Sequence, residues 1–397
     1  MDDIKMAAHE VDAIRDEMKQ MSRYIYDNPE QGLAEEKACK VQTDILTKYG
    51  FSVEPDFCGF PTAYKAVYKG SKPGPTIAML SEYDALPELG HGCGHNLIAL
   101  ISVGAGIAMR KAADEYGGTI WVIGTPAEET LGAKVEMTKA GAFDEADVVM
   151  MSHPAFVDAE SPDLTAINSY KFSFYGVPAH AAAAPEMGVN ALDAMINFFN
   201  LVNALRQQTK PDARIHGIIT KGGTAPNIIP DYTEAIFYVR ANRCAYLEEL
   251  SQKVINCAKG AALGTGARLE YDFVDGNFKD VHSNRTLREL NNQQMEKLGL
   301  KIMRLGDYVA PGSSDIGDVS YACPSIQNGF DITGGKGYGA HTPEFAKCAG
   351  TDEAMERALL YAEGHVLTAI ELMKDPSKLA AIKEEHAHIS DASIGAI

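Results

Sequence analysis

The sequence has no apolar run long enough to cross a lipid bilayer. Its longest apolar stretch, Leu97 to Met109, is shorter than the roughly 20 residues that a transmembrane helix needs. The segment Met1 to Gln20 is polar and charged and has no apolar core of the kind found in signal peptides. We therefore expect a cytoplasmic protein that does not bind membranes.

Cysteine is sparse, and the number of cysteines is odd. A disulfide framework would show dense, even pairing in a short chain, whereas these cysteines are scattered. We expect most of them to be buried free thiols that pack as small hydrophobic side chains. The seven are Cys39, Cys58, Cys93, Cys244, Cys257, Cys323 and Cys348.

Basic residues are too few to balance the acidic ones. The chain has 36 Lys and Arg against 54 Asp and Glu, a formal net charge of -18 at pH 7. Such a field repels polyphosphates, which argues against a nucleic-acid partner. Hydrophobic residues make up 46% and charged residues 23% of the chain, as in soluble globular proteins. The sequence shows no internal repeat and no low-complexity segment.

The length of 397 residues favours two domains over one. In the first part of the chain, periodic helical segments alternate with short β-branched strands, a pattern typical of a mostly parallel sheet with helices on both faces. The expected helices are 8–27, 35–49 and 96–113, and the expected strands are 63–68, 76–80, 119–125 and 148–152.

The middle of the chain changes to the order βαββαβ, which is typical of a ferredoxin-like α+β module. Its expected elements are 169–175, 191–207, 214–221, 232–241, 246–263 and 268–274. We predict a lid and dimerisation domain at 168–280, inserted into a discontinuous catalytic domain formed by 1–167 and 281–397. The latter part would contain helices at 284–297 and 352–373, a loop at 311–318, a strand near Ser325 and a polar, helix-favouring stretch over the last twenty residues.

The strongest chemical signal is the segment Gly90-His91-Gly92-Cys93-Gly94-His95-Asn96. Glycine on both sides of Cys93 lets the backbone bend closely around an ion. A thiolate and an imidazole together suit zinc and similar divalent metals. We leave His91 out of the ligand set, because it also fits an ordinary loop position.

Other polar residues follow predicted strands. Glu128 and Glu129 come directly after the strand 119–125, so one carboxylate could bind a metal while the other acts as a base. His153 lies at another strand end, His341 lies in a later glycine-rich loop, and Asp84 could orient a metal-binding imidazole. Ligands gather at the carboxyl ends of strands in α/β sheets. Each signal alone has an ordinary structural explanation, but together they indicate a metal site.

These motifs occur in an order that resembles the amidohydrolase branch of the zinc aminoacylase/carboxypeptidase family. The resemblance covers nearly the whole chain and looks closest to aminobenzoyl-glutamate hydrolases and β-alanyl-dipeptidase-like members. It rests on Asp84-Ala85-Leu86-Pro87, Gly92-Cys93-Gly94-His95-Asn96, Pro126-Ala127-Glu128-Glu129, His153-Pro154, His341-Thr342-Pro343 and the segment Ser313 to Ser320. Members outside this branch carry a bridging Asp and a further His near the position of Glu82, so Glu82 and Cys93 depart from the wider family but match the branch.

The resemblance implies a two-metal site with Glu128 as the general base. The metal ligands would be Cys93, His95, Glu129, His153 and His341, with Asp84 orienting a ligand from behind. It implies two divalent ions per subunit, with zinc preferred and manganese, cobalt or nickel as alternatives.

Three lid residues complete the expected site. The segment Gly176 to Ala182 resembles the family's lid motif, whose histidine (here His180) stabilises the oxyanion in the partner subunit of a homodimer. Asn227 lies in a segment that resembles a substrate-binding one. Arg240 could grip a substrate carboxylate with two hydrogen bonds.

The resulting expectation is metal-dependent hydrolysis of an amide bond in an N-acyl amino acid or dipeptide-like small molecule that carries a carboxylate, by metal-activated water. An N-deacetylase and a small-peptide carboxypeptidase or dipeptidase remain open alternatives on the same site. So does a catalytically silent metal- or ligand-binding protein, although the presence of both Glu128 and Glu129 argues against it. A hydrolase with Cys93 as nucleophile and His95 as base is weaker, because residues two apart on a tight turn rarely reach the geometry of a nucleophile and its base, and no obvious orienting partner follows them.

Overall fold

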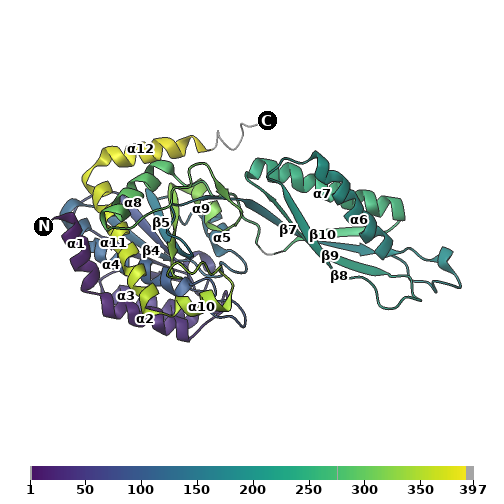
Figure 1. Cartoon of the computed structure of the whole chain (residues 1–397), viewed down its shortest axis with the longest axis horizontal. Coiled ribbons are helices and arrows are strands. Elements are labelled where there is room, and N and C mark those ends of the chain that lie inside the picture. Colours follow the sequence, from purple (N-terminus) through teal and green to yellow (C-terminus); the bar gives the residue numbers. More distant parts are fainter. Residues whose placement is uncertain (1, 275, 390–397) are drawn as a thin grey trace.

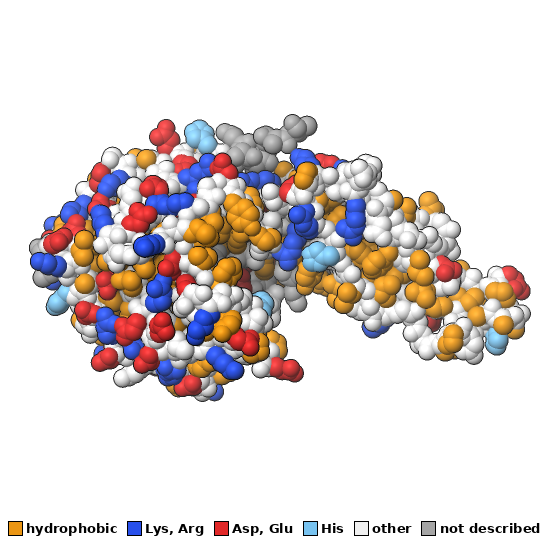
Figure 2. Space-filling view, viewed as in Figure 1, with side chains coloured by type: hydrophobic (Ala, Val, Ile, Leu, Met, Phe, Trp, Pro, Cys, Tyr) orange, Lys and Arg blue, Asp and Glu red, His pale blue; other side chains and the backbone are white. Residues whose placement is uncertain are grey.

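The computed structural model describes residues 2–274 and 276–389 and shows two lobes, one larger and one elongated (Figure 1 and Figure 2). We call them the catalytic domain and the lid, after the sequence prediction. The catalytic domain contains both ends of the described chain. The lid is formed by the middle of the chain, so it is an insertion between two parts of the catalytic domain.

A six-stranded sheet with the order β1-β2-β4-β3-β5-β12 runs through the catalytic domain. The strands β4, β3, β5 and β12 are parallel, whereas β1 and β2 join one edge in antiparallel fashion. This arrangement confirms the predicted mostly parallel α/β class. The strands are β1 (Ser52–Pro55), β2 (Tyr64–Lys69), β3 (Thr76–Ser81), β4 (Thr119–Gly124), β5 (Val148–Ala155) and β12 (Ser325–Asp331).

Helices cover both faces of this sheet, since successive residues of each strand enter different cores. In β4, Ile120 and Val122 pack into the main core, while Trp121 and Ile123 pack into a second core on the other face. The main core is covered by α1 (Asp3–Asp12), α2 (Arg15–Asp27), α3 (Glu36–Lys48), α4 (His95–Tyr116), α8 (Arg285–Lys297), α10 (Pro343–Ala349), α11 (Asp352–Lys374) and α12 (Pro376–Ala387). The second is covered by α5 (Ala133–Lys139) and α9 (Ile316–Ala322).

Helix α4 is the one helix of the described chain that is long and apolar enough to cross a membrane. The most apolar part of this helix is 89% buried inside the protein, where it packs against α11 and the sheet. Packing within the catalytic domain accounts for its hydrophobicity.

The lid has the βαββαβ order expected from the sequence, in a four-stranded antiparallel sheet ordered β10-β7-β9-β8. Its own core brings together Phe172, Phe198 and Phe237, which are buried in mutual ring contact. The domain boundaries at 168 and 280 stay predictions. The lid elements are β7 (Ala166–Tyr175), α6 (Ala191–Leu205), β8 (Arg214–Lys221), β9 (Tyr232–Ala241), α7 (Cys244–Thr265) and β10 (Arg268–Phe273).

The structure corrects several local predictions. The expected helix 8–27 is two helices, separated at Ile14, whose backbone leaves the helical region while its side chain stays buried. Strand β1 was not anticipated, and the expected loop 311–318 already enters α9 at Ile316. The cysteines are all free, but only Cys93 and Cys323 are buried, so the prediction that most are buried was wrong. The end of the helix-favouring C-terminal stretch, 390–397, lies outside the described residues.

Candidate metal centre and active site

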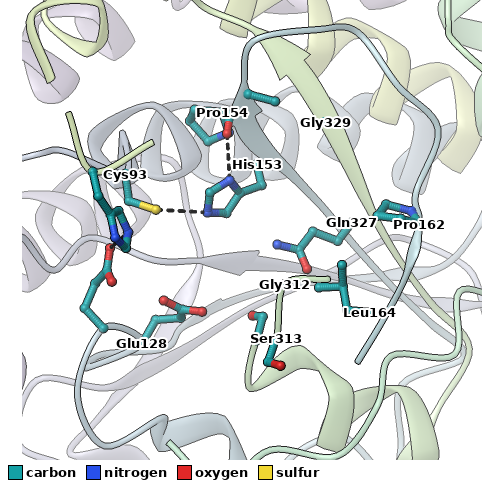
Figure 3. A pocket seen from close by; sticks show the side chains of 14 residues that line it. Cys93, Glu128, His153, Pro154, Pro162, Leu164, Gly312, Ser313, Gln327 and Gly329 are labelled. Atoms are coloured by element: carbon teal, nitrogen blue, oxygen red, sulfur yellow. Dashed lines mark hydrogen bonds and ion pairs between the residues drawn. The ribbon is translucent and has the colours of Figure 1, made fainter. Parts of the chain in front are cut away.

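Four of the five predicted metal ligands line one pocket with Glu128, at the carboxyl ends of the parallel strands. The cavity measures about 310 Å³, and its wall includes Cys93, Glu128, Glu129, His153 and His341 (Figure 3). The fifth, His95, is fully buried behind it at the first turn of α4. The structure thus brings together residues that are up to about 250 positions apart in the chain.

Glycine allows the loop that carries Cys93 to approach β5 closely. Gly94 has a φ of 79°, and a Cβ at this position would lie 2.8 Å from Cγ of Pro154. Because Gly94 has no Cβ, the loop can pack against Pro154. Cys93 Sγ then lies 3.5 Å from Nε2 of His153, the residue before Pro154. The glycine therefore sets the distance between two of the predicted ligands.

The hydrogen bonds of two histidines leave the same ring nitrogen available to a metal. Nδ1 of His95 lies 2.8 Å from the Asp84 carboxylate, and Nδ1 of His153 lies 2.8 Å from the carbonyl oxygen of Pro154. Both partners are acceptors, so each Nδ1 donates a proton to its partner and each Nε2 is the ring nitrogen left to face a metal. Asp84 therefore occupies the position that its predicted orienting role requires.

A strained turn aims the two adjacent carboxylates. Ala127 has a φ of 60°, an unfavourable value for a residue with a side chain. Its N–H donates to buried Glu35 over 2.8 Å, and the N–H of Glu129 donates to Asp84 over 3.0 Å. These two acceptors hold the turn so that Glu128 and Glu129 face the pocket.

His341 approaches the same cluster from the other part of the catalytic domain. Its φ is 64°, and its N–H donates to the carbonyl oxygen of Gly92 over 2.9 Å. Its Nε2 lies 3.4 Å from Oε1 of Glu129. The backbone bond holds the late glycine-rich loop against the loop that carries Cys93, and the side-chain contact holds it against the turn of Glu129.

The donors fit a pair of divalent ions. The sulfur of Cys93 belongs to two groups of three close ligand atoms, one with His95 and His153 and one with Glu129 and His341. Within the described residues, Nε2 of His95 and Oε1 of Glu129 are buried without a hydrogen-bond partner, and the nearest group to the Glu129 oxygen is another predicted ligand, His341, at 3.4 Å. Buried polar atoms of this kind suit a bound cation. Burial raises the pKa of the Cys93 thiol far above its usual value, so the thiolate needs a bound cation to form.

Glu128 lies beside a second buried cluster that sequence reasoning did not find. Nζ of Lys134, fully buried, lies 2.6 Å from Glu82 and 2.7 Å from Asp315, and both carboxylates lie near that of Glu128. Burial, with the nearby charges of Glu82 and Asp315, raises the pKa of Glu128 well above its usual value. A carboxylate with a raised pKa suits proton transfer near neutral pH.

The predicted lid residues occupy two different places. Arg240 lies at the end of β9 near the catalytic domain, where Nη1 donates over 2.8 Å to Ser313, a pocket residue. His180 and Asn227 are exposed neighbours at the other end of the lid, linked through Ala181, whose N–H donates to the Asn227 carbonyl over 3.0 Å. Strand β7 leads outward from the catalytic domain to this end, a span of roughly 30 Å for its length (Figure 1).

Three residues that position the site were missed. Glu35 and Lys134 are isolated in sequence and have no motif around them, so no local signal marks them. Asp315 lies in the Ser313 to Ser320 segment that helped to establish the resemblance, and its strand-end loop was the only available hint. Asp84, which the sequence suggested as the partner of a metal-binding imidazole, lies against His95.

Comparisons with known proteins agree with this geometry. Residues 165–265 match the family model described as a peptidase dimerisation domain. The chain is 36% identical over 396 residues to the Xaa-Arg dipeptidase of Mus musculus, covering 96% of this chain and 91% of that relative. It is 28% identical over 456 residues to a p-aminobenzoyl-glutamate hydrolase chain of Escherichia coli (strain K12), covering 96% and 94%.

A solved structure has the same fold. A dinuclear metal-binding peptidase of the M20 family from Bacillus subtilis superposes with a TM-score of 0.69 at 20% identity, covering 91% of this chain and 99% of that one. Fold and site together define a metal-dependent hydrolase of amide bonds. The chain belongs to the M20 family of metallopeptidases, which confirms the resemblance drawn from its motifs.

Proposed function

We propose that this enzyme hydrolyses the amide bond of an N-acyl amino acid or dipeptide whose amine part carries a carboxylate, with Glu128 as the general base. The observation that carries this proposal is the position of Glu128, in the wall of the same pocket as four predicted metal ligands. The relatives named above, an Xaa-Arg dipeptidase and an aminobenzoyl-glutamate hydrolase, support the substrate class.

The chain's own groups suit the proton transfers of amide hydrolysis. Two divalent ions held by Cys93, His95, Glu129, His153 and His341 would polarise the amide carbonyl and make water more acidic. Glu128 accepts a proton from the attacking water and returns it to the leaving nitrogen. Its raised pKa lets it hold that proton between the two transfers. We propose zinc as the metal because thiolate, imidazole and carboxylate donors suit it.

The lid completes the site in a homodimer under this proposal. His180 and Asn227 lie about the length of β7 from the pocket, so a second copy has to bring them to it. The match to a dimerisation domain supports this assembly. His180 would then donate to the developing oxyanion, while Asn227 and Arg240 bind the substrate carboxylate. We also propose a cytoplasmic location.

The experiment that tests this function combines one substitution with a substrate panel. Glu128→Gln keeps the shape of the side chain but cannot accept a proton, so we expect normal metal content with turnover lower by about 10³-fold or more. Metal is measured by elemental analysis, and turnover on dipeptides, N-acyl and N-acetyl amino acids. Substantial activity in the variant would refute the base, and a preference for N-acetyl substrates would indicate a deacetylase.

The same enzyme preparation distinguishes a metal-dependent hydrolase from a cysteine hydrolase. A chelator should abolish turnover, and added zinc or manganese should restore it. Activity that survives complete metal removal would favour Cys93 as nucleophile. No turnover on any substrate with metal bound would favour a silent binding protein.

A further inference from the structure

Lys134 is a fully buried cation that lies in a cage of three carboxylates. The carboxylate cage consists of Glu82, Glu128 and Asp315, and one oxygen of each lies within 4.8 Å of the other two, a spacing that a metal ion could bridge. Nζ of Lys134 lies 2.6 Å from Oε1 of Glu82 and 2.7 Å from Oδ1 of Asp315. Lysine is almost never fully buried unless it is paired, so the cage and the ammonium group depend on each other.

The protein holds this ammonium group firmly in place. Lys134 lies in the first turn of α5, where its backbone N–H donates over 3.1 Å to Oδ2 of Asp315, the carboxylate that its side chain also binds. Glu82 follows β3 directly, at the edge of the sheet where the predicted metal ligands gather. Burial lowers the pKa of Lys134, but the three carboxylates raise it overall, so the side chain is charged at neutral pH.

The carboxylate cage adjoins the predicted metal centre. Oε2 of Glu82 lies 3.5 Å from Nε2 of His95 and has no hydrogen-bond partner among the residues that the structure describes. Glu128 belongs both to the cage and to a group of close donors with His95 and Glu129. A divalent ion in the cage would therefore use Glu128 as a ligand, and a carboxylate beside such a charge is a weaker base.

We infer that Lys134 is a positioning residue that fills the carboxylate cage as a built-in cation, limits the site to two metal ions and leaves Glu128 unligated as the base. The inference rests on the proposed function, in which Glu128 is that base. Without the ammonium group, the three buried carboxylates have to bind protons or another cation. Donors that are all oxygen suit manganese or magnesium, so manganese is the ion with which we probe the cage.

Lys134→Met tests the inference, because it removes the charge and keeps an unbranched side chain. After loading with excess manganese and removal of the free ion, we expect two ions per subunit in the wild-type enzyme and three in the variant, by elemental analysis. Turnover should fall by about 10²-fold or more, because the third ion binds the base. Adding Asp315→Asn to Lys134→Met removes one ligand of the cage and should return the count to two. Lys139→Met, at the exposed end of the same helix, is the matched control and should keep two ions.

The ion count separates this inference from the function itself, because it is read without substrate. A folded Lys134→Met protein with two ions would overturn the inference, as would a third ion in the wild-type enzyme or in Lys139→Met. If Lys134→Met does not fold, Lys134→Gln gives the same test, because its amide still donates hydrogen bonds but carries no charge. The proposed function fails on a different result, when the wild-type enzyme hydrolyses no member of the substrate panel.

Discussion

Cys93 is the residue on which the predicted metal pair depends most, since its sulfur belongs to both groups of donors. We expect Cys93→Ala to lower the bound metal from two ions toward one or none, because both groups would lose a ligand. Elemental analysis after dialysis measures this. Cys323→Ala is the matched control, since Cys323 is also buried but lies outside both groups of donors. Unchanged metal in Cys93→Ala would remove the thiol from the ligand set.

The pKa of Glu35 makes the stability of the protein depend on pH. Burial is the main cause that raises the pKa of Glu35, from 4.5 to about 7. Between these two values the folded state holds a proton that the unfolded state has released, so the contribution of this group to stability is full below about pH 4.5 and is lost as pH rises through about 7. The contribution amounts to about 3 kcal/mol for a shift of this size.

Glu35→Gln should flatten this pH dependence, because the amide resembles the protonated acid and still accepts from Ala127. Urea unfolding at pH 5 and pH 8 measures it: the decline between the two values should be smaller in the variant. Glu36→Gln, the exposed neighbour on α3, should keep the wild-type decline. An equal decline in all three proteins would contradict the assignment.

At the scale of elements, the site forms where the ends of several strands lie close together, and Gly94 controls how closely two of its segments pack. Gly94→Ala places a methyl group 2.8 Å from Pro154 in a left-handed conformation. We expect a loss of about 1–2 kcal/mol from the backbone alone, with weaker metal binding because Cys93 and His153 are pushed apart. Thermal unfolding and a metal titration measure both.

A second glycine provides the control for that prediction. Gly264 lies within α7 with no atom within 4 Å of an added Cβ and an ordinary φ. Gly264→Ala should leave metal binding intact and stabilise the helix by up to about 1 kcal/mol. If the two variants bind metal equally well, the close approach at Gly94 does not set the ligand distance.

At the scale of the whole molecule, the length of the lid decides whether one chain can complete the site. We expect His180→Ala and Glu128→Gln homodimers to be inactive, and a refolded equal mixture to recover roughly a quarter of wild-type activity. Half of the dimers are then mixed, and each has one site with an intact base and an intact lid histidine. In the control mixture, His9→Ala, a substitution of an exposed residue on α1, replaces His180→Ala. Absence of recovery would mean that His180 does not act across subunits.

Much of the fold followed from local patterns. Period-two strands, helical periodicity and the βαββαβ order identified both domains, because they reflect burial within one element. The break at Ile14 was not predicted because the apolar periodicity continues across it. Strand β1 was not predicted because its four residues are mostly exposed. For the site, the order of the motifs indicated the ligand set, but Glu35 and Lys134 carry no pattern of their own.

The sequence by itself determined which elements form and which chemical groups stand at their ends, since both follow from the order of residues along the chain. Only the tertiary structure decided that Asp84 serves both His95 and the turn of Glu129, that Lys134 is buried between Glu82 and Asp315, and that Glu35 holds the turn at Ala127. The reason is physical: these contacts join segments far apart in the chain, and their distances depend on how whole helices and strands pack.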